Sequence, residues 1–478
     1  MKKLIAFIMV LASAVYADAR VILPDLISDN MVLQRNSKVA LWGKAEPGEE
    51  VEIFASWKTE KMTAKADADG NWKVYIKTPS AGGPYKMFFS DGVGESVTLQ
   101  NVLFGDVWLC LGQSNMVMPM KGFTSQPVED AMEYIVSAKP SSPIRICNVK
   151  RAAKFQEVSS CKCQWQTHTP EAVSGASATA YFFAKRLQET LDIPIGIITS
   201  AWGGSMIEAW MSRETLASNF SSEIDLSFLD REEKPEKVNQ APTMLYNGML
   251  APLQNFGIKG VIWYQGCSNR GFAELYSRFQ PEFVKMLRKM WNNEELPFYY
   301  AQITSYKYSG SENIEAALIR EAQAENSKII PYSGMAVTMD CGDEFVIHPP
   351  KKKPVGDRLA YLALQKTYGM NGFDAVPPMY ESHNIKGNMV YVKFTETLWG
   401  GVGLRGRNLE GFELAGSDRK FYPAEAYCDK DRHTIVVKSD MVPEPVAVRY
   451  AFHNVAPVSV YNTFGIPASP FRTDDWDE

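Results

Sequence analysis

The sequence predicts an α/β protein in which a unit of strands alternating with helices lies between two β-rich modules. Residues 20–103 hold short runs of alternating apolar and polar residues, such as KVALWGKA and NWKVYIKT, with turn formers between them. This alternation is typical of an antiparallel β-sandwich. Near Val107 the pattern changes to apolar strands separated by segments with helical spacing, which indicates a parallel sheet covered by helices. Beyond Gly372 the β pattern returns.

The central unit can be divided into elements in chain order. It opens with the strand DVWLCLG. Further strands are expected at 194–199, 260–264, 298–303 and 334–339, and helices at 178–191, 246–255, 274–291, 314–325 and 355–368. We therefore expect a signal peptide at 1–19, an N-terminal β module at 20–103, an α/β domain at 104–370 and a C-terminal β-rich module at 371–478.

Composition excludes several classes of protein. Of the 478 residues, 45% are hydrophobic and 22% are charged, as in ordinary soluble domains rather than disordered or membrane proteins. The net charge of -5 supplies no basic field for a phosphate backbone, so nucleic acid is not an expected partner. The sequence leaves the oligomeric state open.

The first residues resemble a targeting signal. Lys2 and Lys3 precede the apolar run LIAFIMVLASAV and small residues that end near Ala19, which is the pattern of a signal peptide. The apolar run is short for a membrane span. We therefore expect export to the periplasm or the medium, with no stable membrane insertion after cleavage.

The cysteines do not have the spacing of a zinc site, because Cys161 and Cys163 lack a second pair of ligands. In an oxidising compartment Cys147 could form a disulfide with either of them, and the sequence does not choose. The odd count of 7 leaves at least one thiol unpaired within a monomer. No metal site is predicted.

Residues suited to acyl transfer follow several of the predicted strands. Ser114 stands in GQSNM directly after DVWLCLG, at the carboxyl edge of a parallel sheet, where reacting groups gather. A serine hydroxyl needs a base and oxyanion donors before it acts as a nucleophile. Gly203 and Gly204 follow the strand PIGIIT and leave backbone amides uncovered.

Two more strand ends complete the set. Gln265 and Asn269 in WYQGCSN are carboxamides, which donate hydrogen bonds without a change of charge. His348 follows the strand GMAVTM, and the other histidines lie in a polar loop or in the C-terminal module. Its ordinary pKa suits proton transfer near neutrality. The combination predicts a serine hydrolase.

The motifs GQSNM, AWGGS, WYQGCSN and IHPPKKKPVGDRLA closely resemble those of the sialate O-acetylesterase family, in order and spacing. The resemblance implies an SGNH-type three-layer α/β/α hydrolase domain with flanking β-sandwich-like modules. It also implies action on O-acetylated sugars or glycans without a metal or organic cofactor. Carried over by motif, Ser114 is the nucleophile, His348 is the general base, and Gly204 and Gln265 are oxyanion partners with the Ser114 amide. Gly203 is the alternative to Gly204, and Asn269 is a weaker candidate.

Two positions depart from the family pattern. The family usually reads WYQGESN, but this chain has Cys267 in place of the glutamate, so a carboxylate is missing there. The Asp-x-x-His spacing of many SGNH enzymes is also not met, which leaves Asp343, Glu344 or a backbone carbonyl to orient His348. A nucleophilic Cys267 is disfavoured because it lies on the donor motif.

The sequence leaves three functions open. The first is a sialate O-acetylesterase, and the second is an acetylesterase of polysaccharides such as acetylated xylan or xyloglucan, because the catalytic motifs contact only the acetyl end. The third is a catalytically degenerate carbohydrate-binding protein, which the departures at Cys267 and at Val346, just upstream of His348, keep open. Aromatic candidates for stacking on a sugar ring are Trp165, Trp202, Trp210 and Tyr246.

Overall fold

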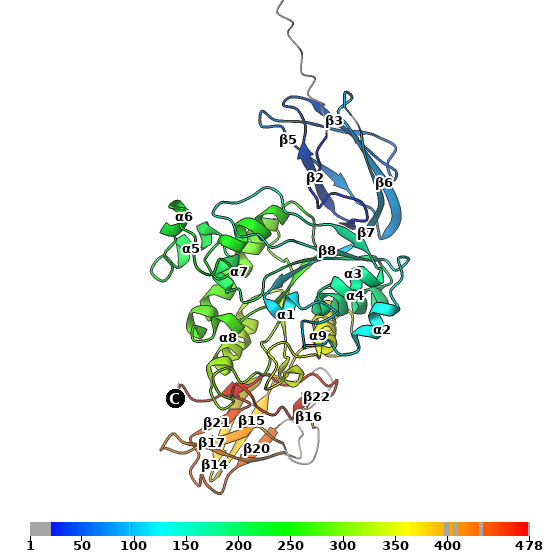
Figure 1. Ribbon diagram of the computed structural model, residues 1–478. Coiled ribbons are helices and arrows are strands. Elements are labelled where there is room, and N and C mark those ends of the chain that lie inside the picture. Colours follow the sequence, from blue (N-terminus) through cyan, green and yellow to red (C-terminus); the bar gives the residue numbers. More distant parts are fainter. Residues whose placement is uncertain (1–20, 95, 396–401, 405–408, 430–433, 477–478) are drawn as a thin grey trace, which may run out of the picture.

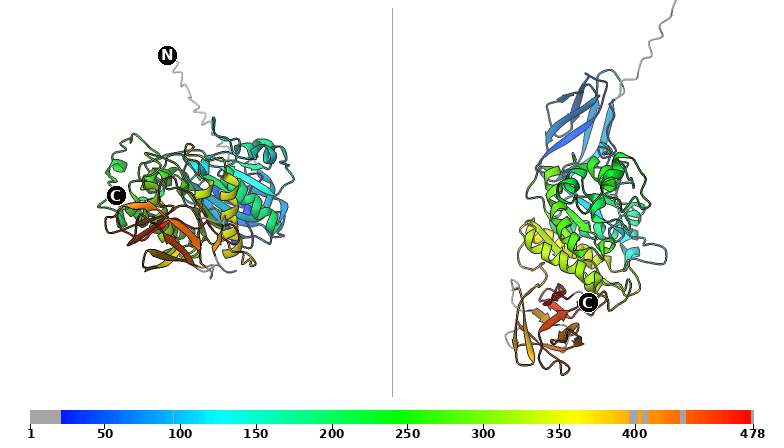
Figure 2. Two further views of the ribbon diagram at one scale, coloured as in Figure 1. Left: turned by 90° about the horizontal axis from the view of Figure 1, so that it is seen from below. Right: turned by 90° about the vertical axis from the view of Figure 1, so that its left-hand side faces the viewer.

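The computed structural model describes residues 21–94, 96–395, 402–404, 409–429 and 434–476. N-terminal strands, an α/β part and C-terminal strands lie in a row, with the α/β part in the middle (Figure 1, Figure 2). The signal peptide expected at 1–19 falls outside the described residues. In the described part, no helix combines the length and apolar character needed to cross a membrane.

The central sheet has the strand order β13-β12-β11-β7-β10-β8-β9. Neighbouring strands pair in parallel, except that β8 and β9 pair antiparallel. Every residue of β10, β11, β12 and β13 is buried, as expected for parallel strands with helices on both faces. The strand bounds are β7 (Val97–Gly112), β8 (Ile144–Asn148), β9 (Trp165–Thr167), β10 (Ile195–Ala201), β11 (Gly260–Tyr264), β12 (Phe298–Ala301) and β13 (Ser333–Ala336).

Helices cover both faces of this sheet and make three layers (Figure 1). Side chains alternate along β7: Trp108 packs in the core beneath α4 and α9, whereas Leu109 packs in the core beneath α7 and α8. The α/β/α fold class is thereby confirmed. The helix bounds are α1 (Ser114–Val117), α2 (Ala131–Val136), α3 (Pro170–Gly175), α4 (Ala178–Leu191), α5 (Arg213–Asn219), α6 (Ser227–Asp230), α7 (Ala273–Trp291), α8 (Glu315–Ile329) and α9 (Lys352–Lys366).

The predicted elements of the α/β part agree closely with the observed ones, with one difference. The helix expected at 246–255 is a π-helical turn, Tyr246–Leu250, followed by a 3₁₀ turn, Ala251–Leu253. Pro252 has no amide hydrogen to continue a regular helix. A Cβ atom on Gly248 would lie 2.2 Å from the carbonyl oxygen of Ala152, so this turn packs backbone against backbone.

The N-terminal strands form two small sheets. In the first, β2 (Lys38–Lys44) pairs antiparallel with β5 (Asn71–Lys77). The second contains β1 (Val32–Gln34), β3 (Glu50–Ala55), β4 (Met62–Lys65), β6 (Gly82–Ser90) and the first half of β7. β1 pairs with β7 in parallel, whereas the other pairs are antiparallel. The predicted antiparallel module therefore contains one parallel pair.

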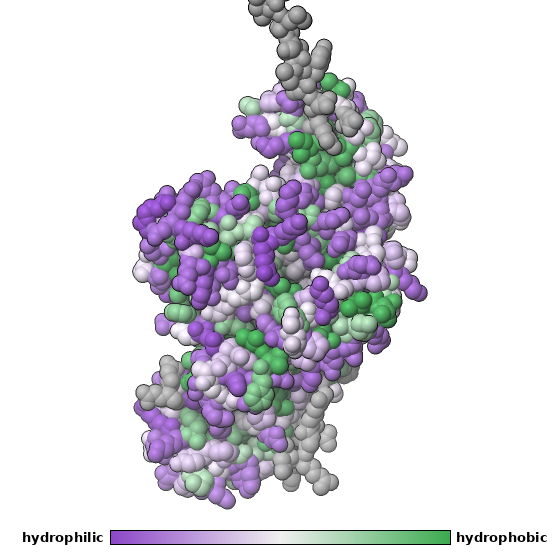
Figure 3. All heavy atoms as spheres, viewed as in Figure 1, coloured by the Kyte–Doolittle hydropathy of each residue, from purple (hydrophilic) through white to green (hydrophobic). Residues whose placement is uncertain are grey.

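The C-terminal strands also form small antiparallel sheets. Their bounds are β14 (Tyr380–Lys386), β15 (Met389–Phe394), β16 (Val402–Leu404), β17 (Phe412–Ala415), β18 (Phe421–Pro423), β19 (Glu425–Cys428), β20 (Thr434–Lys438), β21 (Ala447–Tyr450), β22 (Val460–Asn462) and β23 (Phe471–Arg472). The domain limits at 103/104 and 370/371 stay a prediction, and β7 runs without a break across the first of them. On the face in Figure 3, apolar residues form small separate patches among polar ones.

Candidate active site

Ser114 lies at the carboxyl edge of the central sheet, as the first residue of the short helix α1. Gly112, two residues before Ser114, has a φ of 144°, a backbone conformation that residues with a Cβ atom disfavour. A Cβ atom on Gly112 would lie 2.2 Å from the carbonyl oxygen of Tyr264, and the amide of Gln113 donates to that same oxygen at 3.0 Å. The serine turn is therefore held against the end of β11 by contacts that only glycine permits.

The glycine pair after β10 lies beside this turn. The Trp202 amide donates to the carbonyl oxygen of Gly112 at 3.1 Å. A Cβ atom on Gly203 would lie 3.4 Å from the Cβ atom of Ser114, so Gly203 directly adjoins the serine side chain. The structure thus brings together two of the motifs that the sequence placed at neighbouring strand ends.

The peptide groups of this loop leave amide hydrogens available. Asn239 donates to the carbonyl oxygen of Gly203 at 2.8 Å, and Gln240 donates to that of Gly204 at 3.1 Å. The N–H and C=O of a trans peptide point in opposite directions, so the Gly204 amide points away from Asn239. No described group accepts from the amides of Ser114, Gly203 or Gly204. These amides can donate to an oxygen that develops negative charge beside Ser114.

Gln265 and Asn269 lie behind the glycine loop in a closed network. Gln265 Nε2 donates to the Ser205 carbonyl oxygen at 3.1 Å and to Asn269 Oδ1 at 2.7 Å. Asn269 Oδ1 also accepts from the Ile207 amide, and its Nδ2 donates to Glu208 at 3.0 Å. Both carboxamides are fully buried. In this arrangement they brace the loop, and both N–H groups of Gln265 already have acceptors.

Glu208 is a member of this network that the sequence reasoning did not find. Burial raises the pKa of its carboxyl group, and the hydrogen bond from Asn269 opposes that rise. Its position three residues after Ser205 would only have indicated an ordinary loop residue. The contact appears because the loop after β10 folds back over Asn269.

His348 is oriented by a residue that the sequence did not indicate. Its Nδ1 atom lies 2.6 Å from Gln126 Oε1. A carboxamide oxygen only accepts, so Nδ1 carries the hydrogen and Nε2 is left as an acceptor. The Phe123 ring meets the imidazole edge to face, with centroids 5.0 Å apart.

Neither Asp343 nor Glu344 contacts the imidazole of His348. Asp343 accepts from the amides of Phe345 and Val346 at 2.7 and 3.0 Å, and Glu344 accepts from the Ser311 hydroxyl at 2.7 Å. Both side chains therefore stabilise the loop that carries the histidine. The orienting contact comes instead from the segment after α1, because a carboxamide more than 200 positions away folds onto this loop.

Asn115 ties the serine turn to the histidine loop. Its Nδ2 donates to the carbonyl oxygen of Ile347 at 3.1 Å, and its Oδ1 accepts from the ammonium group of Lys352. Ser114 and His348 are the chain neighbours of these tethered residues, and both are half-buried. The described contacts include no hydrogen bond between them, which is common before substrate binds.

Burial sets the protonation states around the histidine. Burial, together with the positive charge of Lys352, lowers the pKa of His348 to about 4. Burial also lowers the pKa of Lys352 to about 7. The imidazole is therefore neutral at every pH above about 5, and the ammonium group loses its proton as the pH rises through neutrality.

Cys267 is buried under the same edge of the sheet. Burial raises the pKa of its thiol, and a hydrogen bond with Tyr308 opposes the rise. A buried thiol that resists ionisation is a poor nucleophile. Among the described residues, no three His, Cys, Asp or Glu side chains are grouped as ligands for a metal ion.

A three-layer α/β/α fold with a serine turn, a glycine loop and a histidine loop at one sheet edge defines a hydrolase of the SGNH type. Residues 104–365 match the family model for carbohydrate esterases described as sialic acid-specific acetylesterases. The chain belongs to this family, and it is therefore a carboxylic ester hydrolase.

Similar proteins extend the match over nearly the whole chain. The sialate O-acetylesterase of Homo sapiens is 30% identical over 74% of this chain and 72% of that protein. The sialate O-acetylesterase of Mus musculus is 27% identical over 93% of both chains. Among solved structures, a carbohydrate acetylesterase from Xanthomonas citri is 34% identical, with a TM-score of 0.85 over 96% of this chain and 100% of that chain.

The charge of Lys352 predicts a measurable effect on His348. Replacing Lys352 by Met removes the cation that lowers the imidazole pKa, so that pKa should rise from about 4 while the effect of burial remains. NMR titration of the histidine ring signals, assigned with a His348→Ala variant, measures this change.

Lys353→Met is the matched control, because Lys353 is the next residue and pairs with Asp357 instead. Lys352→Arg keeps the charge and should keep the low pKa. An unchanged His348 pKa in Lys352→Met would show that Lys352 does not act on the imidazole.

Proposed function

We propose that the chain removes acetyl groups from O-acetylated sugars by acyl transfer through Ser114. His348 Nε2 takes the hydroxyl proton while Ser114 Oγ bonds to the acetyl carbon, and the carbonyl electron pair moves to its oxygen. When the carbonyl reforms, the bond from the acetyl carbon to the sugar oxygen breaks, and the sugar oxygen takes the proton from His348. Water then repeats these steps, which releases acetate and restores the serine.

This proposal rests on the backbone amide groups near Ser114 that have hydrogens free to donate. The amides of Ser114 and Gly204, with Gly203 as the alternative, have no described acceptor, and Gly203 lies directly beside the serine side chain. They would bind the oxyanion of the tetrahedral intermediate without rearranging. His348 is neutral near pH 7, with its Nδ1 hydrogen directed to Gln126, so Nε2 is left to act as the base.

Gln265 remains the proposed side-chain donor to the oxyanion. Its Nε2 hydrogens are bonded to Ser205 and Asn269, so a direct role requires one of these bonds to open when substrate enters. Its Oε1 is buried without a described partner. Rotating the amide would bring that oxygen against two acceptors, which favours the orientation described here.

The sugar that we propose is a sialic acid. The relatives from Homo sapiens and Mus musculus are sialate O-acetylesterases by name. Beside the glycine loop, the exposed Arg151 places its guanidinium 5.8 Å from the ring of the half-exposed Trp202. A ring that can stack on a sugar and a cation that can meet a carboxylate suit an acidic sugar. Trp165, Trp210 and Tyr246 are buried and unsuited to stacking.

Acetylated xylan or xyloglucan is the alternative substrate, because the acetyl end of the ester is the same.

We also propose that residues 1–19 are a signal peptide and that the mature enzyme acts in the periplasm or outside the cell. The basic start, apolar run and small residues support this proposal. Sequencing the N-terminus of the exported protein tests it.

Replacement of Ser114 or His348 by Ala should lower kcat for a chromogenic acetyl ester by about 10⁴ or more, because the nucleophile or its base is lost. Wild-type kcat/KM should stay level from about pH 5 up to the neutral range in which Lys352 loses its proton, because His348 is neutral and Lys352 is charged over that interval. Steady-state rates measure both.

The controls for these variants are Ser137→Ala and His383→Ala. Ser137 is the C-terminal cap of α2 and His383 lies in β14, so both variants should keep full activity. Full turnover by Ser114→Ala would exclude the serine mechanism. A wild-type enzyme inert on every acetyl ester would favour the catalytically degenerate carbohydrate-binding protein.

The Gln265→Ala substitution tests whether Gln265 donates to the oxyanion or only holds the glycine loop in place. Loss of one donor should lower kcat by about 10² to 10³ with KM little changed. Loss of a brace should instead lower the melting temperature and allow the glycine loop to move. Steady-state kinetics and thermal unfolding of the same preparations distinguish the two, and Gln254→Ala, at the 3₁₀ turn before β11, is the control.

Arg151→Ala tests the sugar. KM for O-acetylated sialic acid should rise by about tenfold, because a charge-assisted contact with the carboxylate is lost. Acetate release from acetylated xylan should not change, because the acetylated xylose units carry no carboxylate. Arg151→Lys keeps the charge and should restore part of the affinity. Wild-type release of acetate from xylan but not from sialic acid would overturn this assignment.

A further inference from the structure

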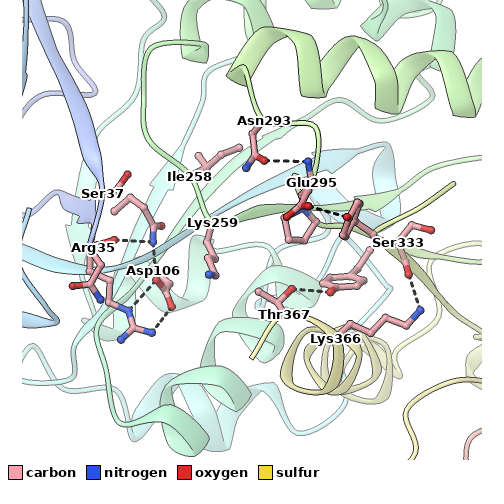
Figure 4. Close-up of a pocket in the computed structure, with 15 residues that line it drawn as sticks. Arg35, Ser37, Asp106, Ile258, Lys259, Asn293, Glu295, Ser333, Lys366 and Thr367 are labelled. Atoms are coloured by element: carbon pink, nitrogen blue, oxygen red, sulfur yellow. Dashed lines mark hydrogen bonds and ion pairs between the residues drawn. The ribbon is translucent and has the colours of Figure 1, made fainter. Parts of the chain in front are cut away.

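A pocket of about 780 Å³ lies at the edge of the central sheet opposite Ser114 (Figure 4). Lys259, Pro297 and Tyr332 immediately precede β11, β12 and β13, so they mark the amino ends of these strands. The turn between β1 and β2 closes one side of the pocket, and the end of α9 closes another. A cavity of this volume has room for one or two sugar rings.

The carboxylates of this pocket already have partners. Asp106 accepts from the Arg35 guanidinium through two bonds of 3.0 Å, and also from Gln34 and Tyr368. Glu295 accepts from the Tyr332 hydroxyl at 2.8 Å. The charge of Asp106 is therefore paired with Arg35, whereas Glu295 keeps its negative charge and orients the Tyr332 hydroxyl.

Two ammonium groups of the pocket have no such partner. Lys259 and Lys366 form no ion pair with any carboxylate in the described ranges. The Lys259 side chain extends into the space between the Arg35–Asp106 pair and Thr367 (Figure 4). Lys366 donates to the Ser333 carbonyl oxygen at 2.8 Å. Cations from two separate elements thus line one cavity, and neither is in ion-pair contact with a carboxylate of the described residues.

Burial of an ammonium group without a negative partner costs free energy. Burial lowers the pKa of Lys366, and the charge of Asp374 only partly opposes this fall, so the charged form is disfavoured where the side chain lies. An anion in the pocket would stabilise that charge through hydrogen bonds from the ammonium group.

Other groups of the lining suit a sugar rather than a small inorganic anion. Tyr299 and Thr367 share a hydroxyl hydrogen bond of 2.7 Å and can exchange it with hydroxyls of a ligand. Tyr332 is 54% exposed, and its hydroxyl donates to Glu295. A fixed aromatic ring can pack on the apolar face of a sugar.

We propose that this pocket is a second ligand site, which binds a carboxylate-bearing sugar through Lys259 and Lys366. We assign this pocket to binding, because its carboxylate Asp106 is already paired with Arg35. Sialic acids and uronic acids share the required chemistry. The proposal does not depend on the reaction at Ser114, because the two sites occupy opposite edges of the sheet.

Ligand-observed NMR titration of the full chain tests the proposal with N-acetylneuraminic acid, glucuronic acid, neutral N-acetylmannosamine and inorganic phosphate. All measurements use a variant with both Ser114→Ala and Arg151→Ala, so that neither turnover nor carboxylate binding beside Ser114 contributes to the signal. A double substitution, Lys259→Met with Lys366→Met, should weaken binding of the sugar acids about tenfold or more. The tighter of the two acids identifies the natural source of the carboxylate.

The control is a second double substitution, Lys285→Met with Lys328→Met, which removes two exposed lysines paired with glutamates on α7 and α8. It should leave binding unchanged. If the sugar acids bind the Lys259→Met/Lys366→Met variant as tightly as the protein that keeps both lysines, the proposed site is wrong. Equal binding of N-acetylmannosamine removes the carboxylate requirement, and phosphate binding as tight as that of the sugar acids reduces the site to an anion site. Either result overturns the proposal, whether or not the esterase reaction is confirmed.

Discussion

Hydrogen bonding along both sides of β7 fixes the position of Ser114. The strand pairs with β1 and β6 in its first half and with β10 and β11 in its second half, so it belongs to two sheets in succession. Near the junction, a Cβ atom on Gly105 would lie 2.0 Å from the Pro194 carbonyl oxygen, so the strands leave no room for displacement. A register shift in the N-terminal sheet would move the serine turn with it.

The histidine loop is positioned by neutral and positive groups. Gln126 holds the Nδ1 hydrogen but brings no negative charge, while Lys352 brings a positive one. A carboxylate at the Gln126 position would favour the protonated imidazole and raise its pKa. With the carboxamide, the imidazole is kept neutral and in one tautomer. The site therefore gains orientation from this contact without gaining stabilisation of the imidazolium ion.

Cys267 lies near a buried cation, Arg320. Arg320 is fully buried, and its guanidinium donates to the carbonyl oxygens of Ile303, Thr304, His453 and Asn454 rather than to a carboxylate. Two of these acceptors lie after β12, and two lie in the C-terminal part. Backbone oxygens thus balance a charge that would otherwise be costly to bury, and they join the C-terminal strands to the α/β fold.

Local patterns in the sequence determined the α/β/α class, the positions of α4 and β11, and the gathering of Ser114, Gly203 and His348 at one sheet edge. These features follow from periodicity and from the rule that parallel strands present their carboxyl ends together. Only the tertiary structure decided which groups meet those residues. Gln126 and Glu208 reach their partners across long chain separations, and their neighbours in sequence carry no sign of it. Lys352 stands in the same motif as His348, but its contact with Asn115 appears only in the fold. The unpaired lysines at the opposite edge are likewise set by which charges the packed fold brings together, because ion pairing depends on distances in space that no local pattern records.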